Sequence, residues 1–264
     1  MPRPLVLVPT YDERENLAPL VAAIRHAGAA RWPFAVMVLD DASPDGTGAV
    51  ADALAASHPG EVIAVHRPAR AGLGRAYADG FARALAGGWD PVFQMDCDFS
   101  HDPAVLPALA AALHDADVAI GSRYVPGGAI PDWPWPRRML SAAANRLARA
   151  ALGGGLRDWT SGFRGFRAEA LRALDVGALR SDGYGYQIEL AWRSLRAGLR
   201  VAEVPIVFRD RTRGRSKLSR RTVIEAAFLL ARLRTASSGL APRAVTAYGS
   251  AVTAHRQRAS TPPS

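Results

Sequence analysis

The sequence has little cysteine and no long apolar run. Its single cysteine, Cys97, excludes an internal disulfide framework and favours a reducing compartment. No stretch approaches the ~18 apolar residues of a transmembrane helix, and residues 5–8 are too few for the apolar core of a signal peptide. We therefore expect a protein of the cytoplasmic side that has no membrane span.

Lysine is almost missing, because all 33 basic residues except Lys217 are arginine. A lone lysine either arises by chance or supplies a compact charge to a phosphate, where arginine does not fit. From Arg200 onward the chain carries 13 basic residues against 3 acidic ones, whereas the net charge of the whole chain is +9. A nucleic acid, an anionic lipid headgroup or a phosphorylated substrate would suit this basic third.

Short apolar runs alternate with amphipathic segments up to about residue 122. We predict strands at 4–9, 34–39, 61–66, 92–96 and 118–122, and helices at 13–27, 47–57, 72–86 and 103–114. This order predicts an α/β fold with a doubly wound, mainly parallel sheet. No G-x-G-x-x-G motif follows the first strand, which weakens a dinucleotide-binding interpretation.

The second half is less regular. We predict a loop at 127–136, a polar and aromatic stretch at 158–167, a basic loop at 210–218, helices at 138–152, 186–197 and 222–233, and a strand at 201–207. From about residue 235 the chain is rich in Ser, Ala, Thr and Pro, which predicts a disordered tail.

Polar side chains follow three of the predicted strands. Tyr11 and Glu13 follow the first strand, Asp41 the second, and Asp96-Cys97-Asp98 the fourth. Parallel neighbours would bring these groups to one edge of the sheet, where α/β folds bind ligands. Turns and helix caps explain any one such group, with Ser43 as the expected cap of the helix at 47–57. Three together favour an active-site edge.

Asp96 and Asp98 are the candidate metal ligands. Alternate residues of an extended chain point the same way, so the two carboxylates would share one divalent cation. Tyr11 would stack on a nucleobase, while Asp41 or Glu13 would accept hydrogen bonds from base or ribose. Such an acidic edge would repel a diphosphate unless a cation lay there, which strengthens the metal interpretation.

Several arginines are candidates for phosphate contacts. Arg123 directly follows the fifth strand and would bind a phosphate or form a surface ion pair. The run that holds Arg211 and Lys217 is equally typical of a solvated face. Two segments would suit a membrane surface: the helix at 222–233, and Trp133 and Trp135 beside their arginines. Ordinary packing is the alternative for both.

Six motifs together resemble the family-2 inverting glycosyltransferases with a GT-A fold, and among them the dolichol-phosphate or polyprenol-phosphate mannose synthases. They are VPTYDERENL at 8–17, LDDASPDGT at 39–47, QMDCDFSHDP at 94–103, GSRY at 121–124, TSGFR at 160–164 and RTRGRSKL at 211–218. The resemblance covers about residues 4–220. It implies a nucleotide-diphospho-sugar transferase fold with a mixed, mainly parallel sheet flanked by helices.

The resemblance also implies roles for individual residues. GDP-mannose would be the donor, and its guanosine would be held by Pro9, Tyr11, Glu13, Leu39 and Asp41. Asp96, Cys97 and Asp98 match a D-A-D site that binds Mg²⁺ or Mn²⁺ through its second acid. The remaining donor-binding positions are Arg209, Arg211 and Lys217, and the acceptor phosphate would contact Arg123, Arg137 and Ser141. Asp98, Arg123, Arg211 and Lys217 would carry catalysis.

Two positions depart from the family pattern. Cys97 replaces the usual Ala, a small change. Ser100 stands where some relatives have a Gln metal ligand, so water would complete the metal shell. The implied domains are a catalytic domain at 1–217, an amphipathic helix at 218–234 that would meet the membrane interface, and the tail at 235–264.

The implied reaction is inverting transfer of mannose to a polyprenyl (dolichyl) phosphate. The enzyme would be peripheral on the cytoplasmic face of the membrane, where a separate anchor protein would be one way to hold it. Transfer of glucose or an N-acetylhexosamine on the same framework is an alternative, as is a catalytically dead scaffold. Nucleic-acid binding fits the pI of about 10.6, but the chain lacks an aromatic-basic platform or a known motif, so we expect no nucleic-acid partner.

Overall fold

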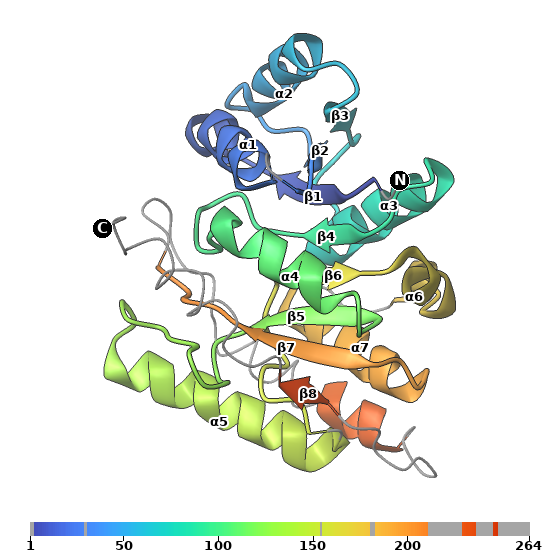
Figure 1. Ribbon diagram of the computed structural model, residues 1–264. Coiled ribbons are helices and arrows are strands. Elements are labelled where there is room, and N and C mark those ends of the chain that lie inside the picture. Colours follow the sequence, from blue (N-terminus) through green and yellow to red (C-terminus); the bar gives the residue numbers. More distant parts are fainter. Residues whose placement is uncertain are drawn as a thin grey trace, which may run out of the picture.

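The computed structural model describes residues 3–28, 31–153, 155–179, 183–210, 229–235 and 245–247. A mixed sheet runs through its centre, with the strand order β3-β2-β1-β4-β6-β5-β7-β8 among these residues (Figure 1). The strands are β1 (Leu5–Thr10), β2 (Ala35–Asp40), β3 (Val62–His66), β4 (Val92–Gln94), β5 (Val118–Ser122), β6 (Arg164–Phe166), β7 (Val201–Pro205) and β8 (Thr246–Ala247).

Helices cover both faces of the sheet. They are α1 (Arg14–Gly28), α2 (Thr47–Ser57), α3 (Leu73–Ala86), α4 (Leu106–Ala112), α5 (Trp135–Leu152), α6 (Ala168–Ala173) and α7 (Gly183–Arg196), with short 3₁₀ turns at Pro103–Val105 and Val176–Ala178. Leu5 and Leu7 of β1 pack into one core with α3 and α7, whereas Val6 and Val8 pack into a second core with α1 and α4. Burial on both faces explains why the strands read as continuous apolar runs.

The predicted α/β fold with a mixed, mainly parallel sheet is confirmed. One strand was missed: β6 lies antiparallel between β4 and β5, inside the stretch predicted as merely polar and aromatic. Its first residue, Arg164, is fully buried and donates hydrogen bonds to the main-chain carbonyls of three other residues. A buried arginine whose side chain is satisfied by main-chain carbonyls gives no apolar pattern from which a strand is predicted.

Three local predictions need correction. Strand β4 ends at Gln94 instead of 96, so Asp96 lies just beyond the strand and Asp98 lies in the turn that follows it. Ser43 does not cap α2, which begins after Gly46 in the left-handed region at φ 90° with no side-chain cap. In the predicted tail, β8 pairs with β7 in parallel, while 236–244 and 248–264 lie outside the described residues.

The described helices include none that is long and apolar enough to cross a membrane. Residues 229–235 are helical and include the end of the predicted interfacial helix at 218–234, whose remaining residues lie outside the described ones. Leu229, Leu230 and Leu233 are buried in the main core. For these residues the packing alternative holds.

Candidate active site at the strand exits

The ends of β1, β2 and β4 lie side by side, as the sequence predicts. β1 pairs in parallel with β2 on one side and β4 on the other. Pro9 stands opposite Leu39 in this register, and the amide of Asp41 donates to the carbonyl of Thr10 at 3.1 Å. The predicted nucleoside-binding residues therefore share one edge with the Asp96–Asp98 turn.

Each of these three exits contains a non-glycine residue in the left-handed backbone region. Asp12 has φ 59°, Ala42 has φ 55° and Phe99 has φ 58°. Such conformations cost about 1–3 kcal/mol each and persist where surrounding contacts enforce them, most often at functional sites. Ala42 is the clearest case, because alanine has no side-chain hydrogen bond to favour this region.

Hydrogen bonds between the loops enforce this backbone. The side chains of Ser43, Thr47 and Asp45 accept from the amides of residues 12, 13 and 14 at 3.0–3.2 Å. The first amides before and within α1 are thus satisfied by the β2–α2 loop. This fixes the β1 exit, with Tyr11 and Glu13, against the β2 exit.

The two adjacent acids of β2 have different partners. Asp40 is buried and accepts from Thr10 and Ser43, which makes it part of the loop scaffold. Asp41 forms an ion pair with Arg67, from the exit of β3. Glu13 accepts from the side chain of Asn16 at 2.7 Å.

The acids after β4 also differ from each other. Asp98 is only 5% exposed, and its Oδ1 accepts from the amide of Ser100 at 3.0 Å, which turns the chain away from the sheet. Asp96 is more open, and its Oδ1 lies 3.4 Å from the hydroxyl of Tyr77 on α3. Arg209, beyond β7, reaches the same turn, since its amide donates to the carbonyl of Ser100 at 3.3 Å.

Two further groups on this turn are held uncharged. Burial raises the pKa of the Cys97 thiol well above its usual value, and the neighbouring carboxylates raise it further, so Cys97 is a packing residue and no nucleophile. Burial lowers the pKa of His101, although Asp96 and Asp98 oppose the shift. Nδ1 of the neutral ring accepts from the amide of Asp96 at 3.3 Å.

The donor set on this turn fits a hard divalent cation. Asp96 and Asp98 offer carboxylate oxygens, which Mg²⁺ and Mn²⁺ prefer, and the thiol between them is buried in the core. Within the described part of the chain, no group of three or more His, Cys, Asp and Glu side chains is placed to hold a metal ion. Mg²⁺ usually binds one or two carboxylates together with water and substrate phosphates, so two acids suffice.

Arg123, after β5, lies in a buried ion pair and not in the surface pair considered from the sequence. Its Nε and Nη2 each donate to Asp158 at 2.7 Å, and Nη2 also donates to Thr160. Burial raises the pKa of Asp158, but the charge and hydrogen bonds of Arg123 outweigh this effect and hold that pKa below its usual value. This pair fixes the Arg123 side chain, whose predicted phosphate contact stays a prediction.

A second acid supports this pair from β7. Glu203 accepts from the amides of Arg157 and Asp158 at 2.9 and 3.0 Å. Burial raises the pKa of Glu203, while hydrogen bonds from Ser122 and these amides oppose the shift.

Arg137 and Ser141 lie one turn apart on α5, close to the exits of β5 and β7. Ser141 accepts from the hydroxyl of Tyr124 at 2.7 Å, and Arg137 pairs with Asp210 at 3.0 Å. Trp133 is buried, with the guanidinium of Arg137 3.9 Å from its ring centroid. The two predicted acceptor-phosphate residues therefore adjoin Arg123, whose guanidinium also lies over Trp133 at 5.9 Å. Arg211 and Lys217 lie outside the described residues.

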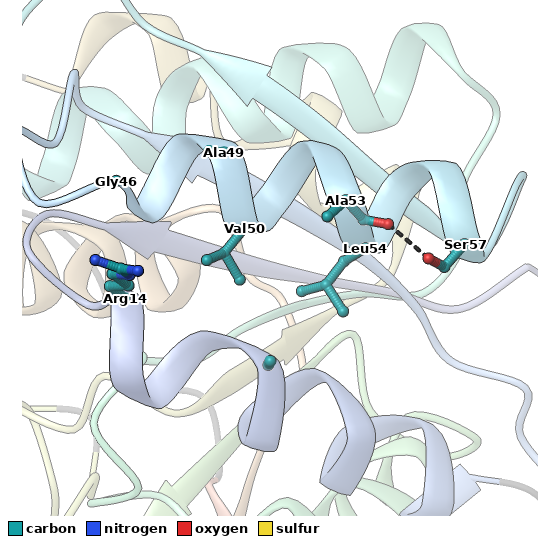
Figure 2. Close-up of a pocket in the computed structure, with 8 residues that line it drawn as sticks. Arg14, Gly46, Ala49, Val50, Ala53, Leu54 and Ser57 are labelled. Carbon is teal, nitrogen blue, oxygen red and sulfur yellow. Dashed lines mark hydrogen bonds between the residues drawn. The ribbon is translucent and has the colours of Figure 1, made fainter.

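An apolar groove of about 500 Å³ lies between α1 and α2 (Figure 2). Arg14 is its only charged lining residue, and Ala18, Val50 and Leu54 are typical of the rest. None of the predicted site residues lines it. The chemistry is therefore expected at the strand exits and not in this groove.

The sequence prediction missed residues that position the site. Arg67 and Arg70 follow β3, and could have been found by extending the strand-exit argument to that strand. Glu203 is an acid within an otherwise apolar strand, which is a signal of a buried pair or network. Asp158 and Tyr77 carry no comparable signal.

Comparison with known proteins identifies the family. The model of glycosyl transferase family 2 matches residues 5–175. Polyprenol monophosphomannose synthase of Mycolicibacterium smegmatis is 47% identical over 230 residues, which are 87% of this chain and 86% of that protein. Undecaprenyl-phosphate mannosyltransferase of Micrococcus luteus is 46% identical over 225 residues, which are 85% of this chain and 90% of that protein.

A solved structure supports the fold assignment. A mannosyltransferase from Pyrobaculum calidifontis, in complex with GDP-Man and Mn²⁺, superposes with a TM-score of 0.59 at 21% identity. The match covers 91% of this chain and 66% of that one. The prediction of a glycosyltransferase fold is confirmed.

Proposed function

Since the chain belongs to glycosyltransferase family 2, we propose that it transfers mannose from GDP-mannose to a polyprenyl phosphate, with inversion at the anomeric carbon. One observation carries the proposal. The exits of β1, β2 and β4 form one edge with Tyr11, Asp41 and the Asp96–Asp98 turn, in a chain whose relatives at 46–47% identity are named for mannosyl transfer to polyprenyl phosphates.

The donor would lie along this edge. Pro9, Tyr11, Glu13, Leu39 and Asp41 would hold the guanosine, and Asp96 the ribose or sugar. A divalent cation on Asp98 and Asp96 would offset the negative charge of the diphosphate. The Pyrobaculum mannosyltransferase, which has this fold and binds GDP-Man and Mn²⁺, supports the choice of donor and metal.

The acceptor would approach from α5. Arg137 and Ser141 would hold the lipid phosphate beside Arg123, which Asp158 keeps in place. A phosphate monoester has a pKa near 6 and is largely dianionic at pH 7, so it needs no dedicated general base. One of its oxygens would attack the anomeric carbon and form the new bond, while the bond to the diphosphate breaks.

Positioning and charge would therefore supply most of the catalysis. Arg211 and Lys217, together with the cation held by Asp96 and Asp98, would neutralise the leaving diphosphate. Arg209 would lie close to the donor, because its amide donates to the carbonyl of Ser100 beside the Asp96–Asp98 turn.

The outer face of α5 is the surface that fits a membrane best. Trp135 is 72% exposed, and Met139, Leu140 and Leu147 are about half exposed along this helix. Arg138, Arg146 and Arg149 are exposed on the same helix, and exposed apolar and basic side chains together are typical of an interfacial helix on anionic lipid. This face would bind the membrane surface, while Arg137 and Ser141 would contact the phosphate of the lipid acceptor.

The experiment is transfer from labelled GDP-mannose to polyprenyl phosphate with Mg²⁺ or Mn²⁺, followed by extraction of the lipid product. UDP-glucose and UDP-N-acetylglucosamine serve as competing donors, and unphosphorylated polyprenol is the control acceptor. Label in the lipid phase only with GDP-mannose and the phosphorylated acceptor supports the proposal. Transfer from a UDP-sugar instead would favour the alternative sugars.

A further inference from the structure

The exit of β3 also reaches the nucleoside end of the candidate site. β3 pairs with β2 in parallel, and Arg67 directly follows it. The amide of Arg67 donates to the carbonyl of Asp40 at 2.8 Å, which holds this segment against the β2 exit. The segment at 67–72 thus borders the edge that Tyr11 and Asp41 occupy.

Arg67 contacts Asp41 directly. Its Nη1 pairs with Oδ1 of Asp41, and the two side chains are only 10% and 9% exposed. Nε of Arg67 lies 3.7 Å from a carboxylate oxygen of Asp79 on α3. Shielding from water makes this contact stronger than an ordinary surface pair, so Arg67 fixes the orientation of the Asp41 carboxylate.

The same segment contacts a second residue of the nucleoside end. The guanidinium of Arg70 lies 4.2 Å from the ring centroid of Tyr11. Two side chains of one short segment therefore contact two of the five residues predicted to hold the nucleoside.

We propose that Arg67 is a positioning residue that sets the specificity of this site for guanine, by fixing the Asp41 carboxylate toward the base. The inference rests on the proposed function. Guanine and uracil both offer a ring N–H, but only guanine offers an exocyclic amino group as well, and an ionised carboxylate only accepts hydrogen bonds. With Oδ1 held by Arg67, Asp41 has a defined oxygen, Oδ2, to accept from that amino group.

The test compares binding of GDP and UDP, each with Mn²⁺, by calorimetry. The proteins are the wild type, Arg67→Ala, Asp41→Ala, the double variant, and Arg83→Ala as a matched control that removes the other arginine paired with Asp79. We expect Arg67→Ala to weaken the binding of GDP by about tenfold or more, as for loss of a hydrogen bond to a charged group. The affinity for UDP should change less than twofold in Arg67→Ala, and Arg83→Ala should bind both nucleotides as the wild type does.

The double variant tests whether Arg67 acts through Asp41. The double variant should bind GDP no more weakly than Asp41→Ala alone. If Arg67→Ala fails to fold, Arg67→Lys replaces it, because lysine lacks the planar fork, and the same loss of preference is expected.

The inference is overturned if an Arg67 variant keeps the wild-type preference for GDP over UDP, or if it binds both nucleotides more weakly to the same extent. Either result leaves the proposed transfer intact. A wild-type protein with no preference for GDP overturns both.

Discussion

The two halves of the sheet build their parts of the site in different ways. At the β3-β2-β1-β4 half, parallel strands end side by side, and hydrogen bonds from Ser43, Asp45 and Thr47 join their loops. At the β6-β5-β7 half, a buried arginine, Arg123, is held by Asp158, which Glu203 supports in turn. The first half is held mainly by hydrogen bonds between its loops, beside the largely shielded Arg67–Asp41 pair, whereas the second depends on the more deeply buried Arg123–Asp158 pair. Removing one partner should therefore cost most stability in the second half.

The largest effect is expected from Asp98→Ala in the first half. We expect turnover to fall by about a thousandfold or more, because the variant removes the better-placed metal ligand and with it several kcal/mol of charge stabilisation. Initial rates with saturating Mg²⁺ would measure this. Circular dichroism should show an intact fold, and turnover near the wild-type level would refute the metal proposal.

The second half should instead lose stability. Asp158→Asn leaves Arg123 buried with no carboxylate partner at this position, and we expect the free energy of unfolding to fall by about 3–5 kcal/mol. Urea denaturation measures the loss. The matched control is Glu61→Gln, which breaks the exposed pair with Arg25 and should cost less than about 1 kcal/mol. Equal losses in the two variants would show that burial does not strengthen the Arg123–Asp158 pair, and would contradict its role in holding the second half.

The outer face of α5 should govern membrane binding. Replacing Trp135, Met139 and Leu147 together by Ser should weaken binding to anionic vesicles by at least tenfold, since it removes three exposed apolar side chains. Vesicle flotation measures this. Leu229→Ala is the control: it should lower stability without releasing the protein, because Leu229 is buried. Unchanged flotation of the triple variant would exclude α5 as the docking face.

The pH dependence of stability should separate the two acids near Arg123. The pKa of Asp158 is lowered by folding, so its contribution is present above the ordinary value of 3.8 and is lost as the pH falls through the lowered pKa. The pKa of Glu203 is raised by burial, so stability falls as the pH rises from 4.5 through the raised pKa.

Glu203→Gln should remove that second slope, and only that one. Thermal unfolding of wild type and variant between pH 4 and 8 measures the difference. A variant that keeps the wild-type slope above pH 4.5 would show that Glu203 does not titrate in this window.

The sequence predicts the first half of the site better than the second. Strand exits could be placed because apolar runs end visibly in Tyr11, Asp41 and Asp96. Strand β6 was missed because it begins with a buried arginine, Arg164, whose hydrogen bonds to main-chain carbonyls leave no apolar pattern in the sequence. Trp133 is buried and Trp135 is exposed, and no local sequence pattern distinguishes the two.

One kinetic measurement tests whether the β3-β2-β1-β4 half binds the donor while the β6-β5-β7 half, with α5 beside it, binds the acceptor. KM for GDP-mannose and for polyprenyl phosphate would be measured in Asp41→Ala and Ser141→Ala, which lie in different halves. We predict that the first variant raises only the donor KM and the second only the acceptor KM, each by about tenfold. If either variant raises both values equally, or raises the other substrate's KM, the assignment of the two halves is wrong.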